Sequence, residues 1–305
     1  MLSFSRILVD IEAAAPQHPA LERAVGLAVR CGAALTIVDV LPEVPARAKG
    51  FLTPELEEEL TMSRGDRLAD IAGRITGVQV GTKVLRGRPA TAIIQEVLRS
   101  GHDLVVRSHA RDLADIPRSL GPVDMELLRQ CPCPVWLIGP GGGPRLRRIA
   151  AAVHSHTDDA AERQLNATIL NLALILRELG EGELTLVEAW SLFGEDLLRA
   201  RMPAEELAEQ VEAMPRAVEA DLAALVASFG DRARGVRTVS LKGTPEDVIP
   251  AFVESEGIDV VVMGTVARTG IAGLVMGNTA ERVLRRLHGN ILAVKPATFV
   301  SPVEA

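Results

Sequence analysis

The chain reads Gly87-Arg88-Pro89-Ala90-Thr91-Ala92-Ile93-Ile94 at one point and Gly243-Thr244-Pro245-Glu246-Asp247-Val248-Ile249-Pro250 at another, 156 positions further along. The same offset carries Asp103-Leu104-Val105-Val106 onto Asp259-Val260-Val261-Val262, with nothing inserted or deleted in between. Self-similarity at a fixed offset indicates duplicated structural units. We therefore interpret the chain as a tandem duplication of one domain.

The two copies also match at their starts, where Arg6-Ile7-Leu8-Val9 corresponds to Arg148-Ile149-Ala150-Ala151 at an offset of 142. Because this offset is smaller, the second copy carries about 14 more residues before its Gly-Thr-Pro segment. The segment Gly139-Pro140-Gly141-Gly142-Gly143-Pro144 combines residues that end regular structure with residues that permit sharp turns. We place the boundary there and expect domains at residues 1–140 and 145–297.

Short apolar runs alternate with longer helical patterns in both copies. The expected strands are Arg6–Ile11, Ala34–Leu41, Gly77–Leu85, Asp103–Ser108, Val135–Ile138, Ile149–His154, Glu183–Trp190, Val236–Leu241, Asp259–Met263 and Ile291–Val294. The expected helices are Pro19–Cys31, Pro54–Ile75, Pro89–Ser100, Val123–Gln130, Ala160–Leu179, Ala204–Phe229, Pro245–Glu256 and Asn278–Leu287. Runs such as Val260-Val261-Val262 are apolar without alternation, as strands covered on both faces are. With right-handed crossovers, the pattern predicts an α/β fold of two tandem doubly wound five-stranded parallel sheets, with flavodoxin-like winding. Ligands of such sheets bind beyond the carboxyl ends of the strands.

The composition excludes several classes of protein. The chain has 305 residues, a formal net charge of −7 and a charged fraction of 24%, which is typical of a soluble globular protein. Only 3% of the residues are aromatic, so rings for stacking nucleic-acid bases are scarce, and so is the positive charge that phosphate backbones attract. No apolar run reaches the roughly 18–20 residues of a membrane span, the N-terminus does not resemble a signal peptide, and three cysteines make no disulfide framework. We expect a cytoplasmic protein with no nucleic-acid partner and no membrane span.

The segment with the most chemical content runs from Met263 to Glu281, from the end of an expected strand to the start of an expected helix. Gly264 lets the backbone approach a ligand closely and permits a positive φ. Gly277-Asn278-Thr279 opens the helix, where unpaired N–H groups and the helix dipole favour an anion. These features predict a phosphate-binding loop, although it is neither a Walker loop nor a G-x-G-x-x-G fingerprint. A purely structural role is the alternative, in which Asn278 with Glu281 is an ordinary N-cap.

In its spacing this segment resembles the universal stress proteins, whose nucleotide-binding members carry G-x2-G-x9-G-(S/T) after the fourth strand. Gly264 and Gly277 match the first and last glycines, whereas Ala267 and Asn278 stand where the second glycine and the Ser/Thr belong. The likeness extends over both copies. It implies an adenine nucleotide alpha hydrolase-like fold and an ATP site in the second copy, with Mg²⁺ accompanying the nucleotide. The cofactor-binding residues that it implies are Ala152, Val153, His154, Met263, Gly264, Thr265, Arg268, Gly277, Asn278, Thr279 and Ala280.

The first copy departs further from the family pattern. The aspartate with which ATP-binding members contact adenosine corresponds by register to Glu12 in the first copy and to His154 in the second. The first glycine, the second glycine and the Ser/Thr of the motif are replaced in the first copy by Ser108, Arg111 and Pro122. Only Gly121 is kept, and Pro122 has no N–H to offer a phosphate. We expect the first copy to be a degenerate domain that binds no nucleotide.

Other candidate sites are weaker. His154 and His156 followed by Asp158-Asp159 have the residue types of metal ligands, yet no four-ligand set assembles nearby. Cys131-Pro132-Cys133-Pro134 marks a turn from helix to strand. Ser108-His109 with Asp112 or Asp115 lacks the G-x-S-x-G elbow of a hydrolase. We therefore expect no metal site and no catalytic residue.

The leading hypothesis is a stress-response protein that acts by ligand binding and by association and is not an enzyme. A slow ATPase or nucleotide-dependent switch is one alternative, and a carrier of an apolar ligand in the vacant clefts is another. The last expected strands, Val135–Ile138 and Ile291–Val294, lie at sheet edges in this topology, and unpaired edges favour pairing. Because members of the family associate there, we expect a pseudo-dimer within one chain through these two strands. A homodimer of whole chains is also considered.

Overall fold

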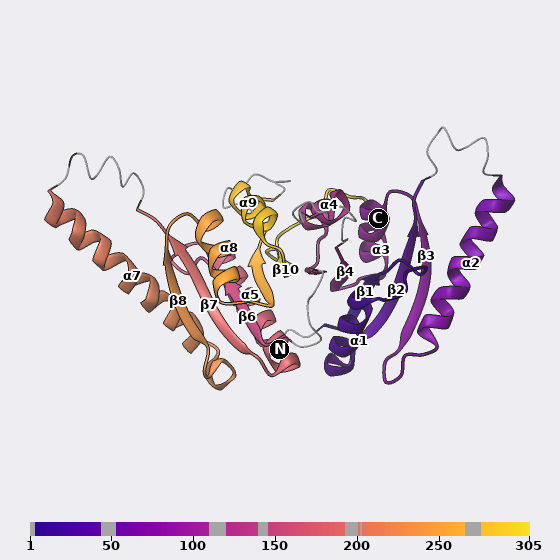
Figure 1. Ribbon diagram of the computed structural model, residues 1–305, viewed down its shortest axis with the longest axis horizontal. Helices are drawn as coiled ribbons and strands as arrows, with labels where there is room; N and C mark the ends of the chain where they lie inside the picture. The colour runs from indigo at the N-terminus through magenta and orange to yellow at the C-terminus, as the bar shows by residue number, and fades with distance from the viewer. Residues whose placement is uncertain are drawn as a thin grey trace. The chain divides into compact units, whose positions relative to one another are not determined.

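The computed structural model describes residues 4–43, 53–109, 120–139, 146–192, 201, 203–265 and 276–305. The chain forms two compact units. Unit 1 comprises Met1–Gly141, Asn290–Ala293 and Phe299–Ala305, and unit 2 comprises Gly142–Gly289 and Val294–Thr298. Strands and helices alternate along each unit, as the colours of Figure 1 show from indigo to yellow. In the described part of the chain no helix is both long and apolar enough to cross a membrane.

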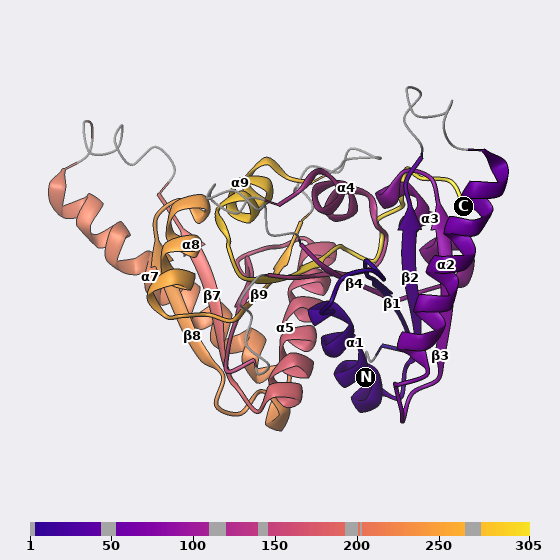
Figure 2. The same ribbon diagram turned by 45° about the vertical axis from the view of Figure 1, so that its right-hand side comes forward.

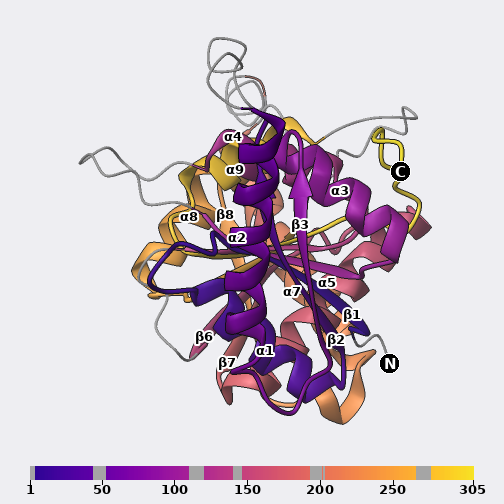
Figure 3. The same ribbon diagram turned by 90° about the vertical axis from the view of Figure 1, so that its right-hand side faces the viewer.

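Unit 1 is a parallel sheet covered by helices. Its elements are β1 (Arg6–Asp10), α1 (Pro19–Cys31), β2 (Ala34–Leu41), α2 (Pro54–Ala72), β3 (Val80–Arg86), α3 (Pro89–Ser100), β4 (Leu104–Ser108), α4 (Pro122–Gln130) and β5 (Val135–Ile138). The strands pair in the order β3-β2-β1-β4-β5, all parallel. With right-handed crossovers this order places α1 and α2 on one face and α3 and α4 on the other. Helix α2 packs over β2 and β3, as Figure 3 shows, and α3 packs against α4.

Unit 1 also contains part of the strand that ends the second copy. Strand β10 (Asn290–Val294) pairs antiparallel with β5, with Leu292 opposite Trp136. All residues of both strands are buried. The side-chain oxygen of Asn290 accepts a hydrogen bond of 2.9 Å from the Gly139 N–H. The β5 edge is therefore covered by a strand from the second copy.

Unit 2 repeats the order of elements. They are β6 (Arg148–Ala152), α5 (Ala160–Gly180), β7 (Glu183–Trp190), α7 (Ala204–Ala227), the 3₁₀ helix η1 (Gly230–Ala233), β8 (Arg237–Lys242), α8 (Pro245–Ser255), β9 (Val260–Gly264) and α9 (Asn278–Arg286). The strands pair in the order β8-β7-β6-β9, all parallel. Helix α7 packs along β7 and β8, which can be followed in Figure 2. The prediction of two tandem doubly wound α/β domains is confirmed.

Local chemistry explains where many helices begin and end. Proline lies at the first turn of α1, α2, α3, α4 and α8, where its missing N–H costs no hydrogen bond. Gly32 and Gly101 end α1 and α3 in the left-handed conformation that glycine adopts without strain. The first strand of each copy is shorter than expected, because β1 ends at Asp10 and β6 at Ala152. The residues that follow each strand are held instead by side chains, as described next.

Candidate functional site

The carboxyl ends of β6 and β9 bring the first group of predicted residues together in unit 2. Ala152 and Met263 are register partners on these neighbouring strands, and both are more than nine-tenths buried. Val153 continues from β6 and donates its N–H to Val187 O at 3.0 Å. Thr265 follows β9 and donates its N–H to Val294 O at 3.0 Å. Segments that lie far apart in the sequence thus meet at one edge of the sheet.

Gly264 has a steric reason to be glycine. A Cβ atom at this position would lie 3.0 Å from Cδ2 of Leu165 on α5, which is tighter than ordinary van der Waals contact. Its backbone is not among those with positive φ, so the conformational freedom considered above is not used. The glycine therefore allows close packing of β9 against α5, independently of any ligand.

The N-terminus of α9 is open. Gly277 is the N-cap residue, it is buried, and it donates its N–H to Thr265 O at 2.9 Å. Asn278 is the first helical residue, so the alternative that Asn278 is the N-cap is wrong, and the N-cap residue, a glycine, has no side chain to cap the helix. The N–H groups of Asn278, Thr279 and Ala280 have no acceptor among the described residues. A helix end of this kind favours an anion through its N–H groups and its dipole.

A buried hydroxyl borders this helix end. Thr265 is fully buried, and within the described ranges its Oγ1 has no hydrogen-bond partner. A buried polar group without a partner costs roughly 1–3 kcal/mol, which a bound acceptor would offset. The hydroxyl of Thr265 thus lies next to the N-terminus of α9, to which its backbone oxygen is bonded through the Gly277 N–H.

His154 is held at the exit of β6 by two side chains. Its Nδ1 lies 3.0 Å from Oε1 of Glu188 on β7, and its backbone N–H and C=O bond to the amide of Asn166 on α5 at 3.2 and 2.6 Å. Ser155 donates its N–H to Oε2 of Glu188 at 2.9 Å and its hydroxyl to the same oxygen. These contacts end β6 at Ala152, because the chain turns away from the sheet to meet them.

Glu188 is ionised in this setting. It is 2% exposed, and burial raises its pKa, but the hydrogen bonds from His154 and Ser155 outweigh burial and place the pKa below its ordinary value. An ionised carboxylate only accepts hydrogen bonds, so Nδ1 of His154 carries a proton and donates it to Glu188. The side chain of His154 is 37% exposed, which leaves the ring accessible to a ligand.

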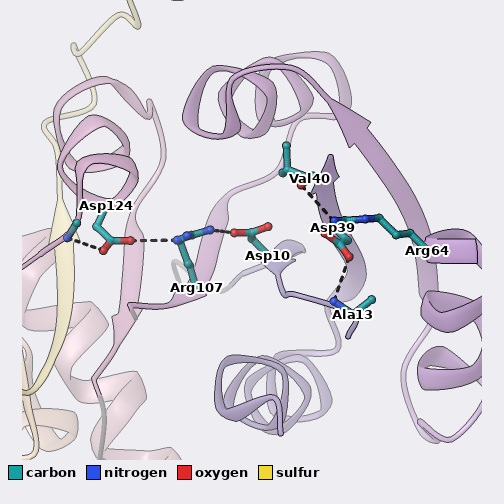
Figure 4. A network of polar contacts seen from close by, with 8 residues as sticks. Asp10, Ala13, Asp39, Val40, Arg64, Arg107 and Asp124 are labelled. Atoms are coloured by element: carbon teal, nitrogen blue, oxygen red, sulfur yellow. Dashed lines mark hydrogen bonds and ion pairs between the residues drawn. The ribbon is translucent and has the colours of Figure 1, made fainter. Parts of the chain in front are cut away.

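In unit 1, an ion triad lies at the carboxyl ends of β1 and β4 and at the start of α4. We define it as Asp10, Arg107 and Asp124. Arg107 on β4 bonds to the Asp10 carboxylate on β1 and, through Nε, to Asp124 Oδ1 at 3.0 Å. Asp124 Oδ2 accepts the Gly121 N–H at 3.0 Å at the start of α4 (Figure 4). Asp10 and Asp124 are at most 5% exposed. The triad therefore joins β1, β4 and α4.

The offsets of 142 and 156 pair these residues with predicted site residues of unit 2. Asp10, Arg107 and Asp124 correspond to Ala152, Met263 and Ala280. Ser108, which corresponds to Gly264, accepts the N–H of Ala20 on α1 at 3.2 Å. Every position that is charged in the triad thus carries an uncharged side chain in unit 2.

The two units share one element of the site that the sequence interpretation missed. Asp39 and Glu188 are each the sixth residue of the second strand of their copy, and both are buried. Each accepts the N–H of a residue that follows the first strand, Ala13 at 3.0 Å and Ser155 at 2.9 Å. The partners of the two acids differ. Arg64 Nη1 lies 2.5 Å from Asp39 Oδ1, and the pair is drawn in Figure 4, whereas the partner of Glu188 is His154. An acid at the same position of the second strand in both copies, flanked by apolar residues, was the signal that could have found both.

The remaining candidate residues do not join this site in the described part of the chain. Arg268, Ala267, Arg111, Asp112 and Asp115 lie outside the described residues. Glu12 is exposed. His156 pairs with Asp221 on α7 at 2.9 Å rather than with His154, and in the described part of the chain no group of three metal-ligating side chains is found. Cys131 and Cys133 are buried with their Sγ atoms 3.6 Å apart.

Comparison with known proteins identifies the repeated domain. The model of the "Universal stress protein family" matches residues 3–139 and 146–295. Universal stress protein E of Escherichia coli K12 is 31% identical over 315 residues, a match that covers 100% of this chain and 98% of that protein. A functionally unknown protein from Pseudomonas aeruginosa PAO1 has a similar structure, with a TM-score of 0.70 and 27% identity over 96% of this chain and 93% of that one. A putative universal stress protein from Pseudomonas aeruginosa UCBPP-PA14 is similar as well, with a TM-score of 0.67, 26% identity and coverage of 96% and 94%.

Proposed function

The chain belongs to the universal stress protein family, with two copies of the family's domain, and we propose that it is a stress-response protein that binds ATP in its second copy. The observation that carries the proposal is the N-terminus of α9, whose first N–H groups have no acceptor among the described residues, beside the Thr265 hydroxyl, which likewise has no described partner. The family resemblance supplies the adenine nucleotide as the expected anion. Binding and association, rather than catalysis, are the proposed modes of action.

The residues of unit 2 fit a nucleotide at two points. The N–H groups of Asn278, Thr279 and Ala280 would hold its phosphates, because they point along the helix axis toward an anion. Nε2 of His154 would accept a hydrogen bond from a ribose hydroxyl or from the amino group of adenine. Mg²⁺ would be carried by the phosphates themselves, since the described residues include no acidic cluster that could hold it. Arg268 stays a predicted contact.

Titration calorimetry with ATP tests the proposal, and Ala280 offers a matched pair of variants. Ala280→Asp places a carboxylate where Asp124 lies in the first copy, in the first turn of α9, so its negative charge would repel the phosphates. Ala280→Asn adds the same bulk without the charge. We expect ATP to bind the wild type, to bind Ala280→Asn within a few-fold of the wild type, and to bind Ala280→Asp at least tenfold more weakly, which is about 1.4 kcal/mol.

The loss in Ala280→Asp will not reflect unfolding, because an acid in the first turn of a helix stabilises it. No heat of binding and no thermal stabilisation of the wild type by millimolar ATP would rule the nucleotide site out. Measurement of phosphate release in the same samples separates a binding protein from the slow ATPase considered above.

We infer further that β10 takes the place of a second molecule at the edge of β5. Both strands are buried along their whole length, and their antiparallel pairing leaves that edge of β5 covered. One chain would then serve as a dimer of single-domain relatives. Sedimentation velocity should find the wild type as a single chain, and Leu292→Pro, which breaks the ladder, should promote self-association. A wild type that dimerises as strongly as the variant would contradict this inference.

A further inference from the structure

The ion triad of unit 1 joins the ends of β1 and β4 and the start of α4, which are equivalent to the elements that form the candidate ligand site of unit 2. In unit 1, Asp124 accepts the N–H of Gly121 at the start of α4, and Arg107 binds the other oxygen of the same carboxylate. A phosphate at a helix N-terminus makes the same two kinds of contact, with backbone N–H groups and with a guanidinium. The Asp124 carboxylate is therefore an anion that the chain supplies to itself.

The triad also ties together the elements that a ligand would join in unit 2. It links the end of β1 through Asp10, the end of β4 through Arg107 and the start of α4 through Asp124. The corresponding elements of unit 2 are β6, β9 and α9, whose residues at these positions carry no charge. Among the described residues of unit 2, the N-cap residue makes no side-chain capping hydrogen bond and the Thr265 hydroxyl has no partner. Unit 1 is thus cross-linked at this edge by a triad that the described part of unit 2 lacks.

Electrostatics oppose a second anion in unit 1. The triad holds two carboxylates and one guanidinium, and both carboxylates are almost fully buried. An incoming phosphate would meet a net negative charge, and it would have to displace Asp124 from two charge-assisted hydrogen bonds. In addition, Pro122 removes one N–H from the helix end.

We propose that Asp124 is an internal substitute for a ligand phosphate, which holds unit 1 permanently in a ligand-bound-like state and restricts the chain to one anionic ligand, bound in unit 2. The location of that ligand rests on the function proposed above, whereas the role of Asp124 is a property of unit 1 alone. Only unit 2 then becomes more ordered when the ligand binds, whereas the order of unit 1 does not depend on a ligand.

The test uses inorganic tripolyphosphate as the probe and full-length variants. Ala280→Asp serves as the background, because it closes the α9 site and any remaining binding must arise elsewhere. Asp124→Asn in this background keeps a side chain that can cap α4 but removes the internal negative charge from Arg107. We expect no thermal stabilisation of Ala280→Asp by tripolyphosphate, and a gain of stabilisation and of measurable binding in the double variant.

Circular dichroism establishes that the double variant is folded. A folded double variant without any gain of tripolyphosphate binding would overturn the proposal, because a merely structural cap would give that result. The result also stands apart from the proposed function: a wild type that binds no ATP beside a double variant that gains tripolyphosphate would refute the ATP site and support the role of Asp124.

Amide hydrogen exchange of the wild type provides a second measurement that needs no variant. The amide of Gly121 should be protected without ligand, and tripolyphosphate or ATP should leave its exchange rate unchanged. Exchange at Asn278, Thr279 and Ala280 should be fast without ligand and slow at least tenfold when ATP binds. Slower exchange at the start of α4 on addition of either compound would show that unit 1 takes an anion, and the proposal would be wrong.

Discussion

Two equivalent places in the copies of one domain differ in charge. They are the ends of β1 and β4 in unit 1, which carry charged side chains, and the ends of β6 and β9 in unit 2, which carry apolar ones. Unit 1 uses Asp10 and Arg107 as register partners, and unit 2 uses Ala152 and Met263. In the first case the side chains satisfy one another. In the second case the backbone donors of a helix are left without an acceptor in the described chain. The copy that departs further from the family's glycine pattern is thus the one that has an internal polar network at this place.

The comparison also shows which part of the site belongs to the fold rather than to a ligand. Both copies keep a buried acid at the sixth position of their second strand, and both use it to hold the backbone after the first strand. What differs is the side chain that donates a hydrogen bond to this acid, Arg64 in unit 1 and His154 in unit 2. Arginine comes from helix α2, whereas His154 comes from the loop itself and keeps one ring nitrogen for another partner.

The largest effect is expected from breaking the triad. Arg107→Met leaves Asp10 and Asp124 buried without their cation, and removal of one partner of a buried ion pair costs about 3–5 kcal/mol. Urea-induced unfolding measures the loss. The matched control is the triple change Asp10→Ala, Arg107→Met and Asp124→Ala, which reproduces the uncharged pattern of unit 2 and should recover much of the stability. A single variant as stable as the wild type would show that the triad contributes nothing.

A smaller effect is expected from the acid that the two units share. Glu188→Gln keeps an acceptor for Ser155 but loses the charge, and hydrogen bonds to charged groups contribute about 1.5–3 kcal/mol. Because contacts in the folded protein lower the pKa of Glu188, its contribution is present above a pH of about 4.5 and is lost as the pH falls through the folded-state pKa. The wild type and Glu188→Gln should therefore differ in stability at neutral pH and converge in acid.

The variant Asp39→Asn sharpens this comparison. Both variants lose a charged acceptor at the same position of the second strand, but only Glu188→Gln removes the partner that fixes the tautomer of His154. Glu188→Gln is expected to weaken ATP binding severalfold, and Asp39→Asn is expected to leave it unchanged. Equal loss of ATP affinity in both variants would mean that His154 does not contact the ligand.

The smallest effect concerns His102, which stands where the second copy has Ile258. Burial lowers the pKa of His102, so the unfolded chain binds more protons than the folded one just below a pH of about 6.5, and stability falls as the pH is lowered through that range. His156 acts in the opposite direction, because its hydrogen bond to Asp221 raises its pKa.

The difference in stability between wild type and His102→Ile can be followed from pH 7.5 to 5.5 by urea unfolding. It isolates the contribution of His102 to the pH dependence of the free energy of unfolding. We expect this difference to shift in favour of the variant in acid. A difference that does not change with pH would show that the pKa of His102 is the same in the folded and the unfolded chain.

Much of the fold could be predicted from the sequence because its signals are local. Helix α1 begins at Pro19 and α3 ends at Ser100 as expected, since proline and glycine act within one turn of the chain. Helix α2 is shorter than expected and ends at Ala72, just before Gly73 and three residues short of Ile75. Such an end depends on packing as well as on propensity.

The candidate site was predictable only in part. Gly264, Gly277 and the start of α9 could be proposed because their spacing matches the glycine pattern of the family. Their placement at one edge of the sheet follows from the order of the strands. Asn166 and Glu188, which hold His154, were missed, because they are 12 and 34 positions from it and no spacing rule connects them.

The sequence by itself determined that one α/β domain occurs twice, and it predicted where each copy begins and which copy matches more of the family's glycine pattern. Repeats, apolar periodicity and turn residues are properties of neighbours along the chain, and they survive without coordinates. Only the tertiary structure decided that Arg107 lies between Asp10 and Asp124, because the first of these partners is 97 positions away. A buried charge is tolerated only where its partner is placed, and that placement exists only once the sheet has formed.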